Sequence, residues 1–253
     1  MKKRTGLILL IALLAAVLLG LGCFIALRLS AAQRAPEPSA AAQDTAAQAP
    51  SSAAPIPAAD PDKTPEPTAT PEPTPEPADS DLVLVKDVIP TIYVDLRYAT
   101  TDNFTGQRIY DFTDARLRYG TLKKLARVQE ALLAQGYSLK IWDAYRPVSA
   151  QFRLWEVCPN SAYVANPNNG YSSHSRGNTI DLTLVRADGT EIPMPSGFDE
   201  FSALADRNYS DVSAEAQSNV AILESAMQAE GFVGYSAEWW HYSDGVGYDV
   251  VME

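Results

Sequence analysis

Histidine and cysteine are scarce in this chain, which has two of each among its 253 residues. Cys23 lies within a long apolar run and Cys158 far from it, so no internal disulfide between them is expected and no CxxC metal site exists. His174 and His241 are the only imidazoles, and both stand beside carboxylates and aromatics. Whether they are ligands of one metal or two unrelated core residues is therefore the first question that the sequence raises.

Positive charge is also in short supply. The chain has 20 Lys and Arg residues against 31 Asp and Glu, for a net charge of −11. The only basic cluster is Lys2-Lys3-Arg4, directly before an apolar run. Because phosphate binding needs clustered Lys and Arg, the composition argues against a nucleic-acid partner.

Composition divides the chain into three zones. Residues 1–30 are basic and then apolar, 31–80 are rich in Ala, Pro, Thr and Glu, and 81–253 have the mixed composition of a globular domain. The middle zone contains PEPTATPEPTPEP, whose prolines favour extended polyproline II, and it is predicted to be a disordered linker. The last zone is large enough to bury a sizeable core.

The first zone predicts a membrane anchor. Gly6 to Leu27 carry no charge, and about 20 apolar residues span a bilayer. The preceding Lys2-Lys3-Arg4 predicts a single-pass helix in the cell membrane with the domain extracytoplasmic. The alternative is a secreted protein, cleaved near Ser30-Ala31-Ala32, but the run exceeds a typical signal core of about 7–15 residues. A lipoprotein at Cys23 fits less well, since Gly20 stands where such signals prefer Leu.

Hydrophobic spacing in the third zone predicts strands and helices in mixed order. The predicted strands are 91–97, 138–142, 179–186 and 235–242, and the predicted helices are 122–135, 148–157 and 213–230. A turn at 187–190 predicts that 191–194 pairs back as a hairpin. These elements indicate an α+β fold, an antiparallel sheet with flanking helices.

The stretch GYSSHSRGNTIDLTLV holds His174 and Asp181, seven residues apart. This is not the i,i+4 spacing of a zinc-binding helix. It suits a loop that bends at Gly177 and enters a strand, so that both side chains converge. Asp181 would then lie on the polar face of that strand, opposite Leu182.

The stretch EWWHY places Glu238 and His241 three residues apart. On a regular strand they would point to opposite faces, and only a bulge or a strand end would bring them to one cavity. With His174 and Asp181 they would complete the three ligands and the general base of a catalytic zinc site. The spacing equally allows that both histidines are hydrogen-bonded structural residues.

Arg146 lies in WDAYRP, before a proline turn. It is either an arginine that pairs with a nearby Asp, or a guanidinium that stabilises the oxyanion of a tetrahedral intermediate or binds a substrate carboxylate.

Four stretches together resemble one family. They are LRYATTDNFTGQRIY, WDAYRP, SSHSRGNTIDLTL and EWWHY. Their order and spacing, with SxHxxGxxxD followed by ExxH, resemble the D-alanyl-D-alanine dipeptidases, the VanX-like zinc peptidases of peptidase family M15. The resemblance covers essentially all of 81–253 and implies the α+β fold of D,D-carboxypeptidases and the Hedgehog signalling domain.

The resemblance also implies site residues. One Zn²⁺ would be held by His174, Asp181 and His241, with Glu238 as general base, Arg146 as transition-state stabiliser, Ser172 as a substrate contact and Asp199 as the carboxylate that receives the free amino group. Tyr98, Asn103 and the pair Trp239-Trp240 are expected to shape the pocket, with core packing as the alternative for one tryptophan.

The implied function is zinc-dependent hydrolysis of D-Ala-D-Ala or related D,D-peptides in cell-wall metabolism. Its substrate would be a small peptide. One alternative is a D,D-carboxypeptidase that trims the terminal D-Ala of peptidoglycan stem peptides. Another is a non-catalytic, zinc-stabilised wall-binding module, which the presence of Glu238 and Arg146 disfavours. The segment 147–172 looks shorter than in the family's best-known enzymes, which predicts a more open pocket.

Overall fold

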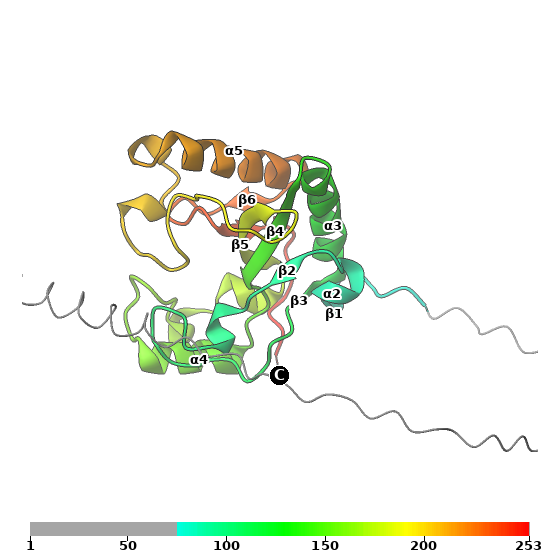
Figure 1. The fold of residues 1–253 in the computed structure, drawn as a ribbon. Coiled ribbons are helices and arrows are strands. Elements are labelled where there is room, and N and C mark those ends of the chain that lie inside the picture. Colours follow the sequence, from blue (N-terminus) through cyan, green and yellow to red (C-terminus); the bar gives the residue numbers. More distant parts are fainter. Residues whose placement is uncertain (1–74, 253) are drawn as a thin grey trace, which may run out of the picture. The chain divides into compact units, whose positions relative to one another are not determined.

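The computed structural model describes residues 75–252 of the protein (Figure 1). In this part of the chain, no helix is both long and apolar enough to cross a membrane. The predicted membrane segment, 1–30, lies outside the described residues, as do residues 31–74 of the predicted linker.

Residues 75–252 form two β-sheets and several helices, with the strands and helices in mixed order along the chain. The strands are β1 (Leu82–Leu84), β2 (Tyr93–Val94), β3 (Arg116–Arg118), β4 (Tyr137–Asp143), β5 (Thr179–Arg186), β6 (Val233–Gly234) and β7 (His241–Ser243). The α-helices are α2 (Val85–Val88), α3 (Tyr119–Leu133), α4 (Val148–Val157) and α5 (Ala214–Ala229). β1 pairs with β3, and the larger sheet has the order β2-β4-β5-β7-β6. The α+β class is thus confirmed.

The larger sheet is mixed rather than antiparallel. β2 pairs with β4 in parallel, while the β4–β5, β5–β7 and β6–β7 pairs are antiparallel. A parallel pair needs a crossover connection, and the segment containing α3 provides it between β2 and β4. The prediction of an antiparallel sheet is therefore wrong at the β2 edge and confirmed for the other pairs.

Helices cover one face of the sheet and leave the other to the site. α3 packs against β4, α5 packs against β5, and the two helices contact each other (Figure 1). Along β5, Leu182 and Leu184 are fully buried members of the core. Their neighbours Asp181 and Thr183 point the other way, as strand alternation requires, and each lines a cavity. β5 is thus buried on both faces, with its polar side chains on the side of the cavities.

Local signals fixed several elements at their predicted bounds. α4 and β5 begin and end where predicted. Ser213 caps α5, because its hydroxyl oxygen accepts a hydrogen bond from the Ala216 amide at 3.1 Å. The prediction that 191–194 forms a hairpin with β5 is wrong, because this segment pairs with β5 through a single bridge, between Val185 and Glu191. Pro193 and the proline two residues later lack amide hydrogens and so cannot extend the ladder.

The predicted strand 235–242 is instead a turn followed by the short strand β7. Trp239 and Trp240 lie in this turn with no exposed surface. The guanidinium of Arg207 donates hydrogen bonds to three carbonyl oxygens of the turn and of His241, at 2.8, 3.0 and 3.0 Å. These bonds replace the sheet contacts that a regular strand would have made.

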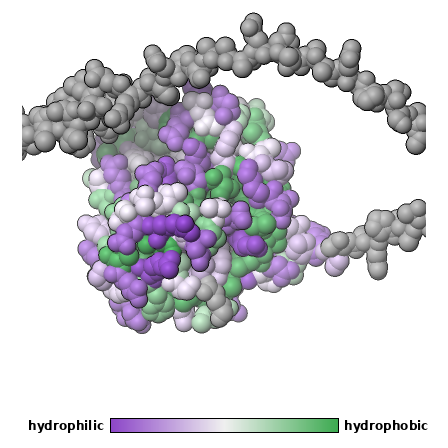
Figure 2. All heavy atoms as spheres, turned by 60° about the horizontal axis from the view of Figure 1, so that its bottom comes forward, coloured by the Kyte–Doolittle hydropathy of each residue, from purple (hydrophilic) through white to green (hydrophobic). Residues whose placement is uncertain are grey.

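On the face drawn in Figure 2, hydrophilic residues are interspersed with small hydrophobic patches. Three exposed tyrosines, Tyr163, Tyr171 and Tyr235, line one cavity, the same one that contains both histidines. This cavity is the candidate site.

Candidate metal centre and active site

The structure brings the three predicted metal ligands together. His174 belongs to a short 3₁₀-helix, Ser173–Arg176, which ends at Gly177 in the left-handed conformation with φ 76°. The chain then enters β5, where Asp181 lies directly opposite His241 of β7. The potential ligand atoms of the three side chains all lie within 4.8 Å of one another. A bend at Gly177 was the predicted means of this convergence, and glycine tolerates that conformation without steric cost.

The interatomic distances suit a shared cation. Asp181 Oδ2 is 3.3 Å from His174 Nε2, and Asp181 Oδ1 is 3.0 Å from His241 Nδ1. Asp181 Oδ1 is buried and nevertheless accepts no hydrogen bond. The two oxygens of this carboxylate thus face one ring nitrogen each, and one of them has no hydrogen bond, which is the donor set of a metal site, so these residues fit a bound metal.

The tautomer of His174 is set by its surroundings. Its Nδ1 lies 2.8 Å from the Ala144 carbonyl oxygen, which can only accept a hydrogen bond. The proton therefore resides on Nδ1, and the lone pair of Nε2 is directed towards Asp181. Burial opposes ionisation of Asp181, but the neighbouring rings of His174 and His241 outweigh it and lower its pKa. Asp181 is accordingly anionic at neutral pH, as a ligand of a cation would need to be.

Glu238 reaches the same cavity from the turn before β7. Its Oε2 lies 3.4 Å from His241 Nδ1, and its side chain is 24% exposed. The odd spacing of EWWHY would separate these side chains on a regular strand, but β7 begins only at His241, so Glu238 is free to turn inwards. Burial, and then the charge of Asp181, raise the pKa of Glu238. A carboxylate with a raised pKa beside a metal site can take up and release a proton.

Arg146 lines the cavity at its buried side and is held firmly. Its Nε and Nη2 donate to Asp143 Oδ2 at 3.1 and 2.5 Å, and its Nη1 donates to Gln151 Oε1 at 2.8 Å. The guanidinium also lies over the ring of Tyr98, 5.1 Å from its centroid. Since a guanidinium has five N–H donors, these contacts leave donors for a ligand in the cavity.

Asp143 and Gln151 are parts of the site that the sequence reading missed. Both are fully buried. Asp143 also accepts hydrogen bonds from the Tyr110 hydroxyl at 2.7 Å and from the Ala144 amide at 2.9 Å. The signal for Asp143 was the spacing in WDAYRP, where an acidic residue precedes Arg146 by three positions. Of the two sequence-based readings of Arg146, pairing with a nearby Asp is confirmed, and contact with a ligand stays a prediction.

Ser172 and Asp199 both line the cavity. The Ser172 hydroxyl oxygen accepts a hydrogen bond from the His174 amide at 3.3 Å, so this residue also caps the turn that presents the histidine. Asp199 has a positive φ of 52°, and its Oδ2 accepts a hydrogen bond from the Tyr98 hydroxyl at 2.6 Å. Burial, above all, raises the pKa of Asp199 to about 8. Within residues 75–252 no cationic side chain forms an ion pair with it.

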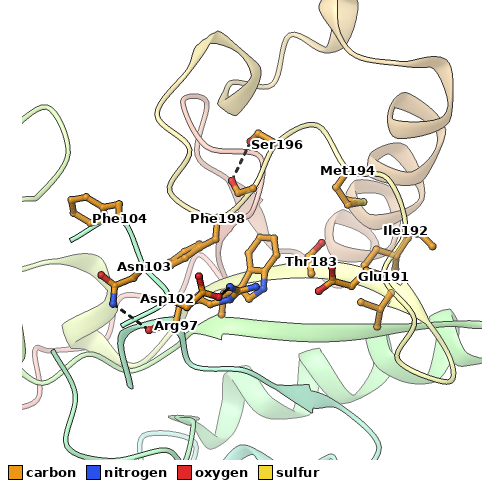
Figure 3. A pocket seen from close by; sticks show the side chains of 14 residues that line it. Arg97, Asp102, Asn103, Phe104, Thr183, Glu191, Ile192, Met194, Ser196 and Phe198 are labelled. Carbon is orange, nitrogen blue, oxygen red and sulfur yellow. Dashed lines mark hydrogen bonds and ion pairs between the residues drawn. The ribbon is translucent and has the colours of Figure 1, made fainter. Parts of the chain in front are cut away.

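Three expected pocket residues lie elsewhere. Asn103 lines a neighbouring pocket of about 350 Å³, where Figure 3 shows it beside Phe104. Its side-chain amide donates hydrogen bonds to backbone carbonyl oxygens of its own loop. Core packing was the alternative for one of the two tryptophans, and both Trp239 and Trp240 are in fact buried in the core. Phe198 lines the neighbouring pocket as well (Figure 3), and the next residue, Asp199, lines the cavity with the histidines, so this loop contributes to both.

The candidate site itself is a cavity of about 350 Å³. That volume is at the small end for ligand pockets and suits a compact, polar molecule. The cavity gathers a potential metal site, one further carboxylate near it, a buried guanidinium and an unpaired carboxylate, Asp199. Such an arrangement can polarise a carbonyl, move a proton and bind a cationic group.

The family model and the curated relatives that this chain resembles are all described as D-alanyl-D-alanine dipeptidases. A family model of peptidase M15, described as D-Ala-D-Ala dipeptidase, matches residues 78–249. The chain is 39% identical to a D-alanyl-D-alanine dipeptidase of Escherichia coli (strain K12), over 64% of this chain and 84% of the relative. It is 36% identical to a D-alanyl-D-alanine dipeptidase of Enterococcus faecium, over 62% of this chain and 87% of the relative.

Among solved structures, the vancomycin resistance D,D-pentapeptidase VanY, in complex with Zn(II), is similar at 16% identity. The similarity covers 53% of this chain and 75% of that one, with a TM-score of 0.34, too low to support any inference.

Proposed function

The chain belongs to the D-Ala-D-Ala dipeptidase family of peptidase M15, and from that premise we propose that it hydrolyses D-Ala-D-Ala with a zinc ion held by His174, Asp181 and His241. Hydrolysis of D,D-peptides follows from the family, and the assignment of residues rests on the site. The observation that carries it is Asp181 Oδ1, a buried oxygen without a hydrogen bond that faces His241 Nδ1 at 3.0 Å.

Zinc at these ligands would lower the pKa of a water molecule and polarise the scissile carbonyl. Glu238 is positioned to take the proton of the attacking water and to return it to the leaving amino group. Its raised pKa brings its proton affinity closer to what both transfers require. Arg146 lines the cavity, and its remaining N–H donors would stabilise negative charge that develops on the carbonyl oxygen.

The other end of the cavity suits the substrate's ammonium group. Asp199 is a desolvated carboxyl group with no cationic partner among the described residues, and a bound ammonium would supply that partner and favour its ionised form. Tyr98 fixes the carboxylate by donating its hydroxyl hydrogen. Ser172, at the cavity wall next to His174, is placed to contact the peptide between the two ends.

The test is a hydrolysis assay on the purified chain with free D-Ala-D-Ala, together with metal analysis. We expect one zinc per chain and D-Ala release that stops on chelation and returns with zinc. Glu238→Gln should keep the zinc and lose activity by about 10²–10⁴-fold. Glu230→Gln, a change in a half-buried carboxylate that follows α5 and pairs with Arg127, is the matched control. Full activity in Glu238→Gln, or full activity without zinc, would contradict the proposal.

We also propose that the enzyme acts outside the cytoplasm, tethered by residues 1–30. The support is the uncharged stretch Gly6 to Leu27 behind Lys2-Lys3-Arg4. Cell fractionation checks this: the full chain should sediment with membranes, and protease added to spheroplasts should degrade the domain. Recovery of the full-length chain in the soluble fraction would contradict the tether.

A further inference from the structure

A row of aromatic rings joins two loops at the Asp199 end of the cavity. Tyr163, from the segment after α4, stacks on Phe201 with ring centroids 4.7 Å apart and an interplanar angle of 30°. Phe201 meets the edge of Phe104 at 5.2 Å, and Phe104 meets the edge of Tyr98 at 6.4 Å. The row ends where the Tyr98 hydroxyl bonds Asp199.

Tyr163 is held in place despite being 47% exposed. Its amide donates to the Asn160 carbonyl at 3.0 Å, which closes a turn. The next residue, Val164, is buried in the core, and Gln151 Nε2 donates to the Ala165 carbonyl at 2.7 Å. The exposed ring is therefore carried on an anchored backbone, and its contact with Phe201 is part of the folded structure rather than a chance approach of a loose loop.

One ring of the stack belongs to the wall of the cavity that holds Asp199. Tyr163 and Asp199 both line the cavity, whereas Phe201 does not and lies behind Tyr163. Phe201 follows Asp199 by two residues, and Tyr163 shares the cavity wall with Asp199, so a peptide that continued past a group bound to that carboxylate would run towards the ring pair.

We propose that the Tyr163–Phe201 stack is a specificity gate that restricts the enzyme to peptides with a free amino end at Asp199. The inference rests on the proposed function and deepens it, since it names the residues that separate a dipeptidase from a carboxypeptidase acting on stem peptides. The two rings have no role in the chemical step. The gate determines only which substrates can enter the cavity.

Two penalties combine against an N-acylated peptide. Acylation removes the positive charge, so Asp199 loses its partner, and it adds atoms where the stack stands. The second penalty is steric and belongs to the gate alone. Truncating either ring removes the steric penalty and leaves Asp199 and Tyr98 in place. Pocket contacts of this size are worth about tenfold or more in substrate discrimination.

The experiment compares kcat/KM for free D-Ala-D-Ala and for N-acetyl-D-Ala-D-Ala in the zinc-loaded enzyme. We expect the wild type to prefer the free dipeptide. Tyr163→Ala and Phe201→Ala should each raise the ratio of acetylated to free substrate by about tenfold. Tyr163→Phe, which keeps the ring, should leave the ratio at the wild-type value. So should Phe152→Ala, which removes an exposed aromatic ring that does not line the cavity.

The outcomes separate the gate from the function beneath it. A zinc-loaded wild type that cleaves neither substrate would contradict the proposed function. A wild type that cleaves the free dipeptide, with an unchanged ratio in both alanine variants, would overturn only the gate. An equal change in Tyr163→Phe and Tyr163→Ala would overturn it as well, because the hydroxyl and not the stack would then be responsible.

Discussion

Asp181 of β5 and His241 of β7 are direct partners across the sheet, and their side chains place Oδ1 and Nδ1 3.0 Å apart with no hydrogen bond to Oδ1. Two strands therefore hold two of the proposed ligands in fixed register, and the turn before β5 adds the third, His174. A site set by strand pairing is formed by the folded chain before any ion arrives. Metal binding should accordingly stabilise the fold rather than create it.

Zinc should raise the melting temperature of the domain in proportion to the logarithm of its concentration. At 100 times the dissociation constant, the gain is about 2.7 kcal/mol, and about 2–4 °C per kcal/mol is typical at this size. Thermal melts with zinc and with chelator measure it. His241→Ala should fold yet respond far less to zinc. Identical melting of the wild type in both conditions would exclude this metal site.

Asp143 should be essential for holding Arg146. Asp143→Asn preserves the shape but leaves a buried guanidinium without its counter-charge, and breaking a buried pair costs about 3–5 kcal/mol. Urea denaturation of Asp143→Asn, Arg146→Met and the double variant measures the coupling. We expect the double variant to be markedly more stable than the sum of the two losses predicts. Additive losses would show that the pair is not energetically coupled.

The sequence predicted the site better than the sheet around it. His174 and Asp181 share a short stretch whose glycine bend and strand alternation can be read locally, and α4, β5 and the α5 cap follow equally local rules. The parallel edge pair could not be read locally, because it depends on where α3 returns the chain. The turn of EWWHY depends on Arg207, which lies some thirty residues before it and satisfies its carbonyls.

Long sequence separation in one case, and burial of a polar side chain in another, account for what was missed in the site. Tyr98 and Asp199 are 101 positions apart, and nothing near either residue announces their hydrogen bond. Gln151 sits on α4 with the ordinary appearance of a polar helix residue, yet it is fully buried beside Arg146. Burial of a polar side chain is a property of the assembled fold, and burial is what gives these residues their roles.

Asp199 should make the domain less stable as pH rises. Its folded pKa is about 8 and its ordinary value 3.8. Between these values the unfolded chain has lost the proton that the folded chain retains, so the stability from this group falls across that window. Asp199→Asn should therefore gain stability relative to the wild type from pH 5 to about pH 8.

Melting curves of the zinc-saturated wild type and of zinc-saturated Asp199→Asn, recorded from pH 5 to about pH 8, test this pH dependence. The same variant should bind free D-Ala-D-Ala more weakly, seen as a higher KM, because the ammonium loses its partner. A stability difference that stays constant with pH would contradict the assignment, whatever its size.

Gln151 should act as a positioning residue through Arg146. Its Oε1 accepts from Arg146 Nη1 at 2.8 Å while its Nε2 donates to the Ala165 carbonyl at 2.7 Å. Gln151→Met removes both bonds at similar volume, and the lost bond to a charged group is worth about 1.5–3 kcal/mol. If that bond orients the guanidinium for the transition state, kcat should fall about tenfold or more with little change in KM.

Gln151→Glu separates the two bonds, because it keeps an acceptor for Arg146 and loses the donor to Ala165. We expect its kcat to recover towards the wild-type value, while the Met variant stays low. Steady-state kinetics on free D-Ala-D-Ala, with melting curves of each variant, distinguish the outcomes. If both variants lose stability equally and kcat follows stability rather than the Arg146 contact, Gln151 only fills space, and the guanidinium is positioned by Asp143 alone.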